Sequence, residues 1–511
     1  MDGSKGNEGA EAVGVPELDD PGSKFSTLQF LRFCGSGLLM SVSYLDPGNL
    51  EADIQVGVAT GYDLLWWYAT CAVLLGFVVQ CLAGQLGLVT GQDLAQVCGQ
   101  RYPRFARWLL WLLLELAIVG ADIQETIGSA IAIFILSGGA IPLWAGCILI
   151  SVTAFLLLLL DRFGFRHIEA VFGIFIAVEA VALGMNFFQA GVDADALVRG
   201  LVVPTLTRSS LPVAVGALGA LVMPYNIYFQ SSIVNARPRD TSTEGRMGML
   251  LTYMRLENMI MLVMAFVINV FVVCVFAEGF YDPAADPQPD IGLESAGDHL
   301  ADHYGSIFRT MWAVGLLASG QVATISLTYA GQLVMTGLLG VKVSAGPRML
   351  ATRMVALVPT VLMAVFFEAS NTFDAAAQLL NVGQSLLLPF ALLPVVHMTA
   401  NVDVMGRRWV SGRWWTGVSI GITVATVAVN GYLLVDSLVA QHDGGLTWPW
   451  MMLTISTTLL YYAIVAYYAI GPDNIPEAMQ RTRKLCAQAT NWVARCLSQR
   501  LDPESALESR W

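Results

Sequence analysis

About twelve apolar segments, each long enough to cross a lipid bilayer, follow one another along this 511-residue chain. A helix needs about 20 apolar residues to span the hydrocarbon core of a membrane. Only 13% of the residues are charged, whereas about 25% is usual in soluble proteins. The sequence therefore predicts an all-α polytopic membrane protein with about twelve transmembrane helices. The expected spans are 27–56, 63–88, 106–135, 140–160, 166–187, 211–236, 248–277, 306–336, 348–367, 373–398, 413–438 and 447–470.

Polar ends flank one transmembrane domain over residues 27–470. We expect residues 1–26 to be a disordered cytosolic N-terminus, because they are polar and lack the basic and apolar regions of a signal peptide. Residues 471–511 are predicted to be a cytosolic C-terminal tail. Lys and Arg gather in alternate connections, which predicts that both termini are cytosolic. These residues are Arg101, Arg104, Arg107, Arg162, Arg166, Arg237, Arg239, Arg246, Lys342, Arg348, Arg407, Arg408 and Arg413.

Composition excludes several classes of protein. The net charge of −12 gives no basic surface for nucleic acid. Since the sequence has no Walker A loop, we expect neither nucleotide binding nor ATP-driven transport. The eight Cys are scattered without a CxxC pair, which indicates packed thiols. We expect no enzyme activity and no resident cofactor.

Two of the apolar spans are interrupted by similar motifs. The first span contains Asp46-Pro47-Gly48-Asn49, and the sixth contains Met223-Pro224-Tyr225-Asn226. Proline removes a backbone donor and breaks a helix, and free backbone at membrane depth is tolerated where it lines a cavity or is buried. Because the breaks lie five spans apart, they predict two inverted repeats, about 27–187 and 211–398, followed by extra helices at about 413–470. This arrangement is typical of secondary transporters that bind substrate at the midplane. Two unrelated proline kinks are the alternative.

The groups at the two breaks could bind a divalent metal ion. Asp46 and Asn49 offer oxygen atoms, the break before Pro224 frees a carbonyl near Ala220, and Met223 offers a thioether sulfur. Sulfur adds little for Mg²⁺ or Ca²⁺ but favours softer metals. The set therefore favours Mn²⁺ or Fe²⁺, with Cd²⁺ as a toxic mimic. The alternative is that Met223 only fills space in the core.

The sequence resembles the Nramp (natural resistance-associated macrophage protein) family of divalent-metal transporters over residues 27–470. The resemblance is strongest in five segments: Tyr44–Gln55, Glu115–Ala132, Met223–Ser231, Gly320–Gly337 and Asn381–Leu393. It implies an amino-acid-transporter-like fold of two inverted five-helix repeats and symport of Mn²⁺ or Fe²⁺ with protons toward the cytosol. It also implies a set of metal ligands: Asp46, Asn49, the Ala220 carbonyl, Met223 and Gln384.

The resemblance further implies a proton pathway from Asp46 through Asp122 and Glu125, with Arg353 as a counter-charge. Asp122 and Glu125 are three residues apart, on one face of a helix. Buried carboxylates without a partner can exchange protons near neutral pH. A structural salt-bridge network with Arg353 is the alternative for these two acids.

Two positions depart from the family pattern. Where the family has Met-Pro-His-Asn and a further histidine, this chain has Tyr225 and Gln230. Neither side chain titrates near neutral pH as an imidazole does. We therefore expect proton coupling to be weakened or to depend on Asp46, Asp122 and Glu125. An uncoupled Mg²⁺ or Mn²⁺ transporter of the same family and a metal sensor that does not transport remain alternatives. The sequence leaves the oligomeric state and the membrane of residence open.

Overall fold

The computed structural model describes Thr27, Phe30 and most of the chain from Tyr44 to Asn474. The described ranges are 44–158, 165–235, 243–285, 291–341, 345–368, 373–443 and 448–474. Within them, the side chains of 157–158, 165–172, 345–353, 366–368, 373–375, 436–443 and 448–450 are not described. The predicted N-terminal tail, residues 31–43 of the first span and residues 475–511 of the C-terminal tail lie outside the described part.

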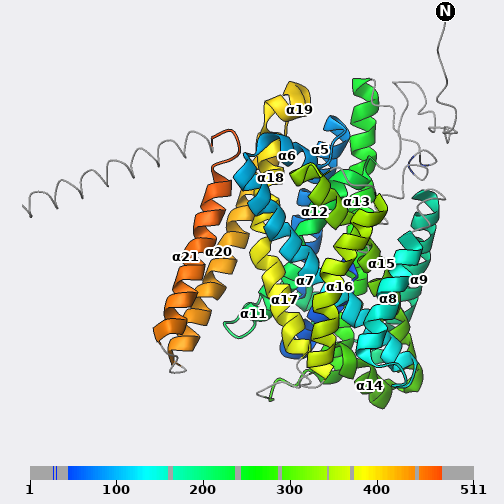
Figure 1. The fold of residues 1–511 in the computed structure, drawn as a ribbon. Helices are drawn as coiled ribbons and strands as arrows, with labels where there is room; N and C mark the ends of the chain where they lie inside the picture. Colours follow the sequence, from blue (N-terminus) through cyan, green and yellow to red (C-terminus); the bar gives the residue numbers. More distant parts are fainter. Residues whose placement is uncertain are drawn as a thin grey trace, which may run out of the picture.

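Helices make up the bundle throughout the described residues, which contain no strand (Figure 1). The long ones are α5 (Phe77–Thr90), α7 (Arg104–Leu136), α8 (Leu143–Leu158), α9 (Phe165–Ala190), α13 (Glu244–Phe280), α15 (Ser306–Leu339), α16 (Ala345–Glu368), α20 (Arg413–Asp443) and α21 (Trp448–Ala469). The short helices α6 (Leu94–Arg101), α10 (Ala194–Val202), α14 (Leu293–Tyr304) and α19 (Val402–Trp409) lie in the connections. Eight helices of the described part are long and apolar enough to span a membrane. The predicted fold class, an all-α polytopic membrane protein, is confirmed.

Within the described residues, three spans have a break in their helix. The helix of the first span begins at its break as α3 (Pro47–Thr60), and the sixth span is divided into α11 (Leu211–Leu221) and α12 (Pro224–Ile233). Both interruptions lie where the sequence predicts them. A third interruption divides the tenth span into α17 (Phe373–Leu387) and α18 (Pro389–Ala400). The sequence predicts a span over 373–398, with no prediction of a break at Pro389.

The second span also differs from a regular α-helix. Between α4 (Leu65–Ala69) and α5, residues Thr70–Gly76 form a π-helix. Such a segment widens the helix locally and is common at functional sites. The apolar run at 63–88 contains no feature that predicts it.

Close backbone contacts hold the interrupted helices against their neighbours. A Cβ atom on Gly219 of α11 would lie 1.9 Å from the Asn381 carbonyl oxygen of α17. A Cβ atom on Gly128 of α7 would lie 2.4 Å from Cβ of Pro47. Because no side chain larger than hydrogen fits at either position, glycine allows α11 to approach α17 and the start of α3 to approach α7.

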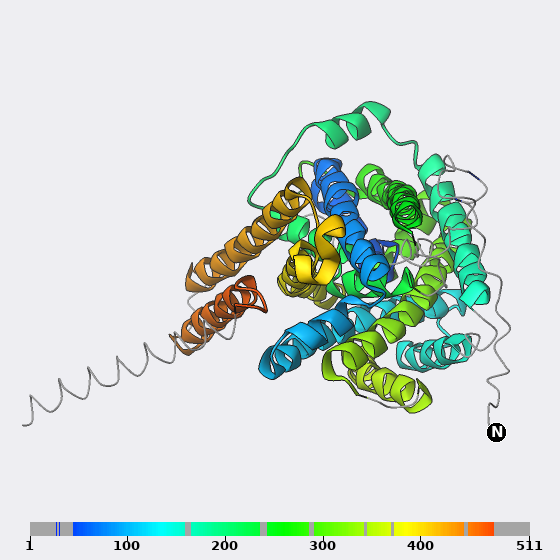
Figure 2. The ribbon, with the colours of Figure 1, turned by 90° about the horizontal axis from the view of Figure 1, so that it is seen from above.

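The last two helices form a hairpin at one edge of the bundle. Figures 1 and 2 show α20 and α21 side by side, outside the core helices. Their outward faces carry large apolar side chains such as Val424, Leu459 and Leu460, which are more than half exposed. Such a surface is expected of helices that face lipid.

Candidate metal site

Asp46 occupies the first interruption as the N-cap of α3. Its Oδ1 accepts a 2.8 Å hydrogen bond from the Asn49 backbone N–H, and Pro47 fills the first helical position, where no N–H is needed. Asp46 and Asn49 are completely buried. Among the described residues, Oδ2 of Asp46 and both polar side-chain atoms of Asn49 have no hydrogen-bond partner. A buried carboxylate oxygen and a buried amide oxygen are therefore available to a ligand.

Met223 occupies the second interruption, in extended backbone between α11 and α12. Pro224 begins α12 and has no N–H, so the Ala220 carbonyl loses the donor that a continuous helix would supply. Both Ala220 and Met223 are completely buried. The interruption thus leaves a carbonyl oxygen and a thioether within three residues of each other.

The two interruptions meet around Gly48. A Cβ atom at Gly48 would lie 3.2 Å from Cε of Met223 and 3.3 Å from Oδ1 of Asp46. Oε1 of Gln124 would also lie 3.3 Å from it, and this atom has no hydrogen-bond partner among the described residues. A carboxylate from one break, a thioether side chain from the other and an amide oxygen from α7 therefore surround one point.

Gln124 is a residue that the sequence analysis missed. Its Nε2 donates to the Ala377 carbonyl at 3.0 Å and to Oδ1 of Asn381 at 2.9 Å, both on α17. Nδ2 of Asn381 in turn donates to the Gly48 carbonyl at 3.1 Å. The only signal in the sequence is that Gln124 stands between Asp122 and Glu125. Its proximity to Gly48 follows from the packing of α7 against α3 and α17.

Gln384 lies on the last turn of α17 and contacts α7. Its Nε2 donates a 2.7 Å hydrogen bond to the Ala117 carbonyl, and its Oε1 has no partner among the described residues. The amide oxygen of Gln384 is therefore available to a ligand, but Gln384 is not among the residues that surround Gly48. No described contact joins its side chain to Asp46 or Met223.

The predicted proton pathway is only partly described. Asp122 and Glu125 are buried on α7, and the Glu125 carboxylate oxygens have no hydrogen-bond partner within the described residues. Glu125 lies within electrostatic range of both Asp46 and Asp122. Arg353 belongs to α16, but its side chain is outside the described part of the chain, so its role as counter-charge stays a prediction.

The two positions that depart from the family pattern lie on α12. Tyr225 is completely buried, within electrostatic range of Asp46 and Glu125, and its hydroxyl has no partner among the described residues. Gln230 donates from Nε2 to Oδ1 of Asn258 on α13 at 3.2 Å. Tyr225 thus lies near the acids that the prediction assigns to proton transfer, whereas Gln230 joins two helices.

Comparison with known proteins identifies close similarities over most of the chain. Residues 37–436 match the family model described as natural resistance-associated macrophage protein-like. The chain is 39% identical over 485 residues to the metal transporter nramp1 homolog of Dictyostelium discoideum, covering 94% of this chain and 88% of that protein. It is 41% identical over 447 residues to metal transporter Nramp2 of Oryza sativa, covering 87% and 84%.

A solved structure shares the fold. The crystal structure of the Eremococcus coleocola manganese transporter, in complex with an aromatic bis-isothiourea compound, matches with a TM-score of 0.76 at 26% identity. The match covers 89% of this chain and 97% of that one. The similarity therefore extends over most of the helical bundle.

Proposed function

Since the chain belongs to the Nramp family, we propose that it is a secondary-active transporter of divalent transition metal ions, Mn²⁺ and Fe²⁺ and also Cd²⁺. The observation that carries the proposal is the cluster around Gly48, where Asp46 and the Met223 side chain approach the same point from two interrupted helices. A hard carboxylate combined with a thioether suits metals of intermediate softness. The relatives named above are metal transporters, which supports the same class of substrate.

The proposed ligands are Asp46, Asn49, Met223, the Ala220 carbonyl and, in some states, Gln384. They would replace water around the ion while it crosses the membrane interior. Movement of the interrupted helices against a scaffold of α7, α8, α15 and α16 would then expose the ion to the cytosol, with both termini on the cytosolic side. Hinge movement at breaks is expected because the helix has lost hydrogen bonds there.

Proton coupling is proposed to be weak. Tyr225 replaces a histidine next to the site, and its buried phenol cannot exchange a proton near neutral pH as an imidazole does. Coupling would then depend on Asp46, Asp122 and Glu125. The same replacement favours a second candidate, an uncoupled Mg²⁺ or Mn²⁺ transporter, whereas the thioether of Met223 favours transition metals.

Uptake into proteoliposomes tests the proposal. The purified chain is reconstituted with a trapped dye that Mn²⁺ quenches, and Mg²⁺ uptake is measured in parallel. We expect Mn²⁺ uptake by the unmodified chain and no uptake by Asp46→Asn. The control is Asp63→Asn, which changes an exposed acid in the turn after α3 and should preserve uptake. Absence of Mn²⁺ uptake by the unmodified chain, or uptake that survives Asp46→Asn, contradicts the proposal.

A pH-sensitive dye inside the same vesicles tests the coupling. We expect Mn²⁺ uptake to change little between external pH 5.5 and 7.5, and Tyr225→His to make it more dependent on acid pH. Steep acid stimulation of the unmodified chain, with one proton entering for each metal ion, would refute weak coupling while leaving metal transport intact.

A further inference from the structure

Asn430, a buried residue of the C-terminal hairpin, contacts the third interruption. Its Nδ2 donates to the Ser385 carbonyl at 2.7 Å, and its Oδ1 accepts from the Ser385 hydroxyl at 2.8 Å. In a continuous helix the Ser385 carbonyl would accept from residue 389, which is proline and has no N–H. Asn430 therefore supplies a donor that the break removes, and Tyr461 of α21 lies 3.3 Å from the same amide nitrogen.

Ser385 directly follows Gln384, so this contact fixes the turn of α17 that carries a proposed metal ligand. On the opposite side, Gln384 is held by the Ala117 carbonyl of α7. The turn is thus held between α7 and α20. Loss of the Asn430 amide would leave the Ser385 carbonyl with only a 3.3 Å contact from the Leu388 N–H.

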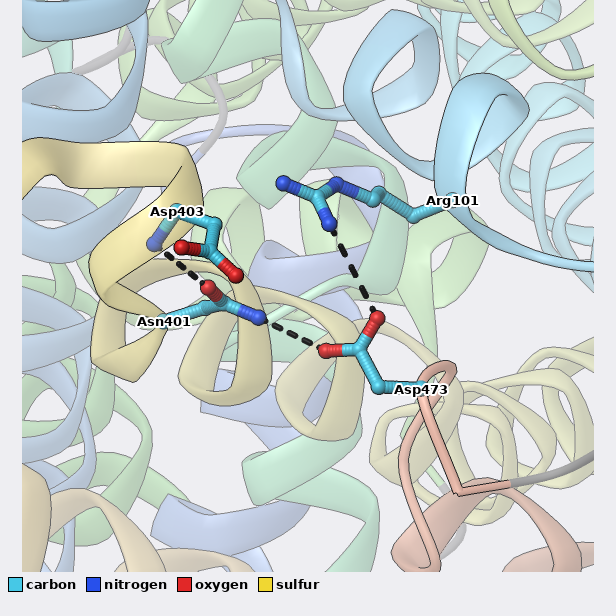
Figure 3. Close-up of polar contacts among 4 residues, drawn as sticks. All are labelled: Arg101, Asn401, Asp403 and Asp473. Carbon is cyan, nitrogen blue, oxygen red and sulfur yellow. Dashed lines mark hydrogen bonds and ion pairs between the residues drawn. The ribbon is translucent and has the colours of Figure 1, made fainter. Parts of the chain in front are cut away.

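The hairpin is attached to the same span at a second point. Asp473, in the turn after α21, accepts a 2.7 Å hydrogen bond at Oδ2 from Nδ2 of Asn401, the residue that follows α18 (Figure 3). Its Oδ1 lies 3.8 Å from Nη1 of Arg101 at the end of α6. Tyr468 donates from its hydroxyl to the Ala106 carbonyl of α7 at 2.6 Å. The hairpin and the turn that follows it therefore contact the last turn of α17, the residue after α18, and also α6 and α7.

The two attachments differ in strength. The Asp473 side chain is 54% exposed and that of Arg101 32%, and ion pairs with this much solvent contribute little. Asn430 and Ser385 are completely buried and exchange two hydrogen bonds. In a membrane interior, where water cannot replace a lost partner, the buried pair has the larger effect.

We propose that Asn430 is a positioning residue for metal transport, through which the hairpin of α20 and α21 holds the turn that places Gln384 in the metal path. This inference rests on the proposed function, in which Gln384 is a ligand. It gives the two helices outside the repeats a role in substrate binding. Asn430 itself need not touch the ion.

Replacement of Asn430 tests the proposal in the full chain in proteoliposomes. We expect Asn430→Leu to raise the KM for Mn²⁺ about five- to tenfold, the effect of about one buried hydrogen bond. The matched control is Thr426→Val, one turn earlier on α20. Thr426 is also buried, but its hydroxyl donates to the Ile422 carbonyl of its own helix. We expect this control to leave the KM unchanged.

A double-mutant cycle distinguishes positioning from a general structural effect. If Asn430 acts through Gln384, Asn430→Leu should have little further effect on the KM in a Gln384→Ala background. An equal effect in both backgrounds, or an unchanged KM in Asn430→Leu alone, overturns the proposal. If Asn430→Leu does not purify as a folded protein, Ser385→Ala replaces it in the same cycle, because it removes only the hydroxyl partner.

The cycle also separates this inference from the proposed function. Mn²⁺ uptake that is lost in Asp46→Asn but has a normal KM in Gln384→Ala would support metal transport and overturn the role of Asn430. Absence of uptake by the unmodified chain would instead overturn the proposed function.

Discussion

Asn381 on α17 donates a 3.1 Å hydrogen bond from Nδ2 to the Gly48 carbonyl on α3, which joins the tenth span to the first interruption. Its Oδ1 accepts from Nε2 of Gln124 on α7 at 2.9 Å. One buried amide therefore connects three helices next to the proposed metal ligands. Because both of its polar atoms are used, Asn381 defines how α3, α7 and α17 are placed relative to one another.

Replacement of Asn381 by leucine should lower stability and slow metal uptake. The change removes the donor to Gly48 and leaves the Gln124 amide with one partner fewer, at a cost of about 1–3 kcal/mol. Thermal unfolding in detergent, followed by intrinsic fluorescence, measures the first effect, and Mn²⁺ uptake measures the second. Ser419→Ala is the control, because the hydroxyl of buried Ser419 donates to the Trp415 carbonyl of its own helix. Equal melting temperatures for Asn381→Leu and the unmodified chain would contradict the role assigned to Asn381.

Replacement of Gly48 by alanine should weaken metal binding by about tenfold or more without unfolding the protein. The new methyl group would lie between Met223 Cε, Asp46 Oδ1 and Gln124 Oε1, all 3.2–3.3 Å away, and would occupy the space between the proposed ligands. Isothermal titration with Mn²⁺ or Cd²⁺ measures the affinity, where tenfold corresponds to about 1.4 kcal/mol. Gly417→Ala on α20 is the matched control, since its Cβ would have no neighbour within 4 Å. Unchanged affinity in Gly48→Ala would place the ion elsewhere.

Removal of the Met223 sulfur should change selectivity. We expect Met223→Ala to lose about tenfold or more in Cd²⁺ affinity and to admit Mg²⁺ or Ca²⁺ more readily, because hard ions gain little from a thioether. Met223→Leu separates sulfur chemistry from packing, since leucine preserves most of the side-chain volume. Titration with Cd²⁺ and uptake of Mg²⁺ are the measurements. Loss of Cd²⁺ affinity in the alanine variant only would assign the effect to packing.

Stability should depend on pH through Asp93, which caps α6 outside the membrane spans. Its Oδ1 accepts a 2.8 Å hydrogen bond from the Gln96 N–H, and burial raises its pKa from 3.8 to about 6. Because the folded state binds this proton more tightly than the unfolded state, the stabilisation is greatest below pH 3.8 and declines as pH rises to about 6. The change amounts to roughly 3 kcal/mol at most.

Asp93→Asn should remove this part of the pH dependence, since asparagine keeps a capping oxygen but does not ionise. Melting temperatures at pH 4.5 and 6.5 in detergent measure the difference. Asp195→Asn, an exposed acid in the first turn of α10, should leave the pH dependence unchanged. The same slope in Asp93→Asn and the unmodified chain would show that Asp93 does not titrate in this range.

The sequence predicted the helical class and two of the three interruptions that the described residues contain. Pro47 and Pro224 indicated breaks because each stands beside polar or sulfur-containing residues in an apolar run. Pro389 has only apolar neighbours, and Leu388 keeps helical backbone angles, so nothing local distinguishes that break from a mild kink. The π-helical segment at Thr70–Gly76 likewise has no signal in the apolar run that contains it.

What the sequence by itself determined is where backbone donors are missing, because the absence of an N–H is a property of proline alone. Which groups fill those places was decided by tertiary structure. Gln124 reaches the neighbourhood of Gly48, and Asn430 reaches Ser385, from helices that are distant in sequence. Their amides resemble any other polar side chain until packing brings them to a free carbonyl or a free ligand position. The cluster around Gly48 therefore depends on how the helices pack, whereas its two proline breaks are determined by the local sequence.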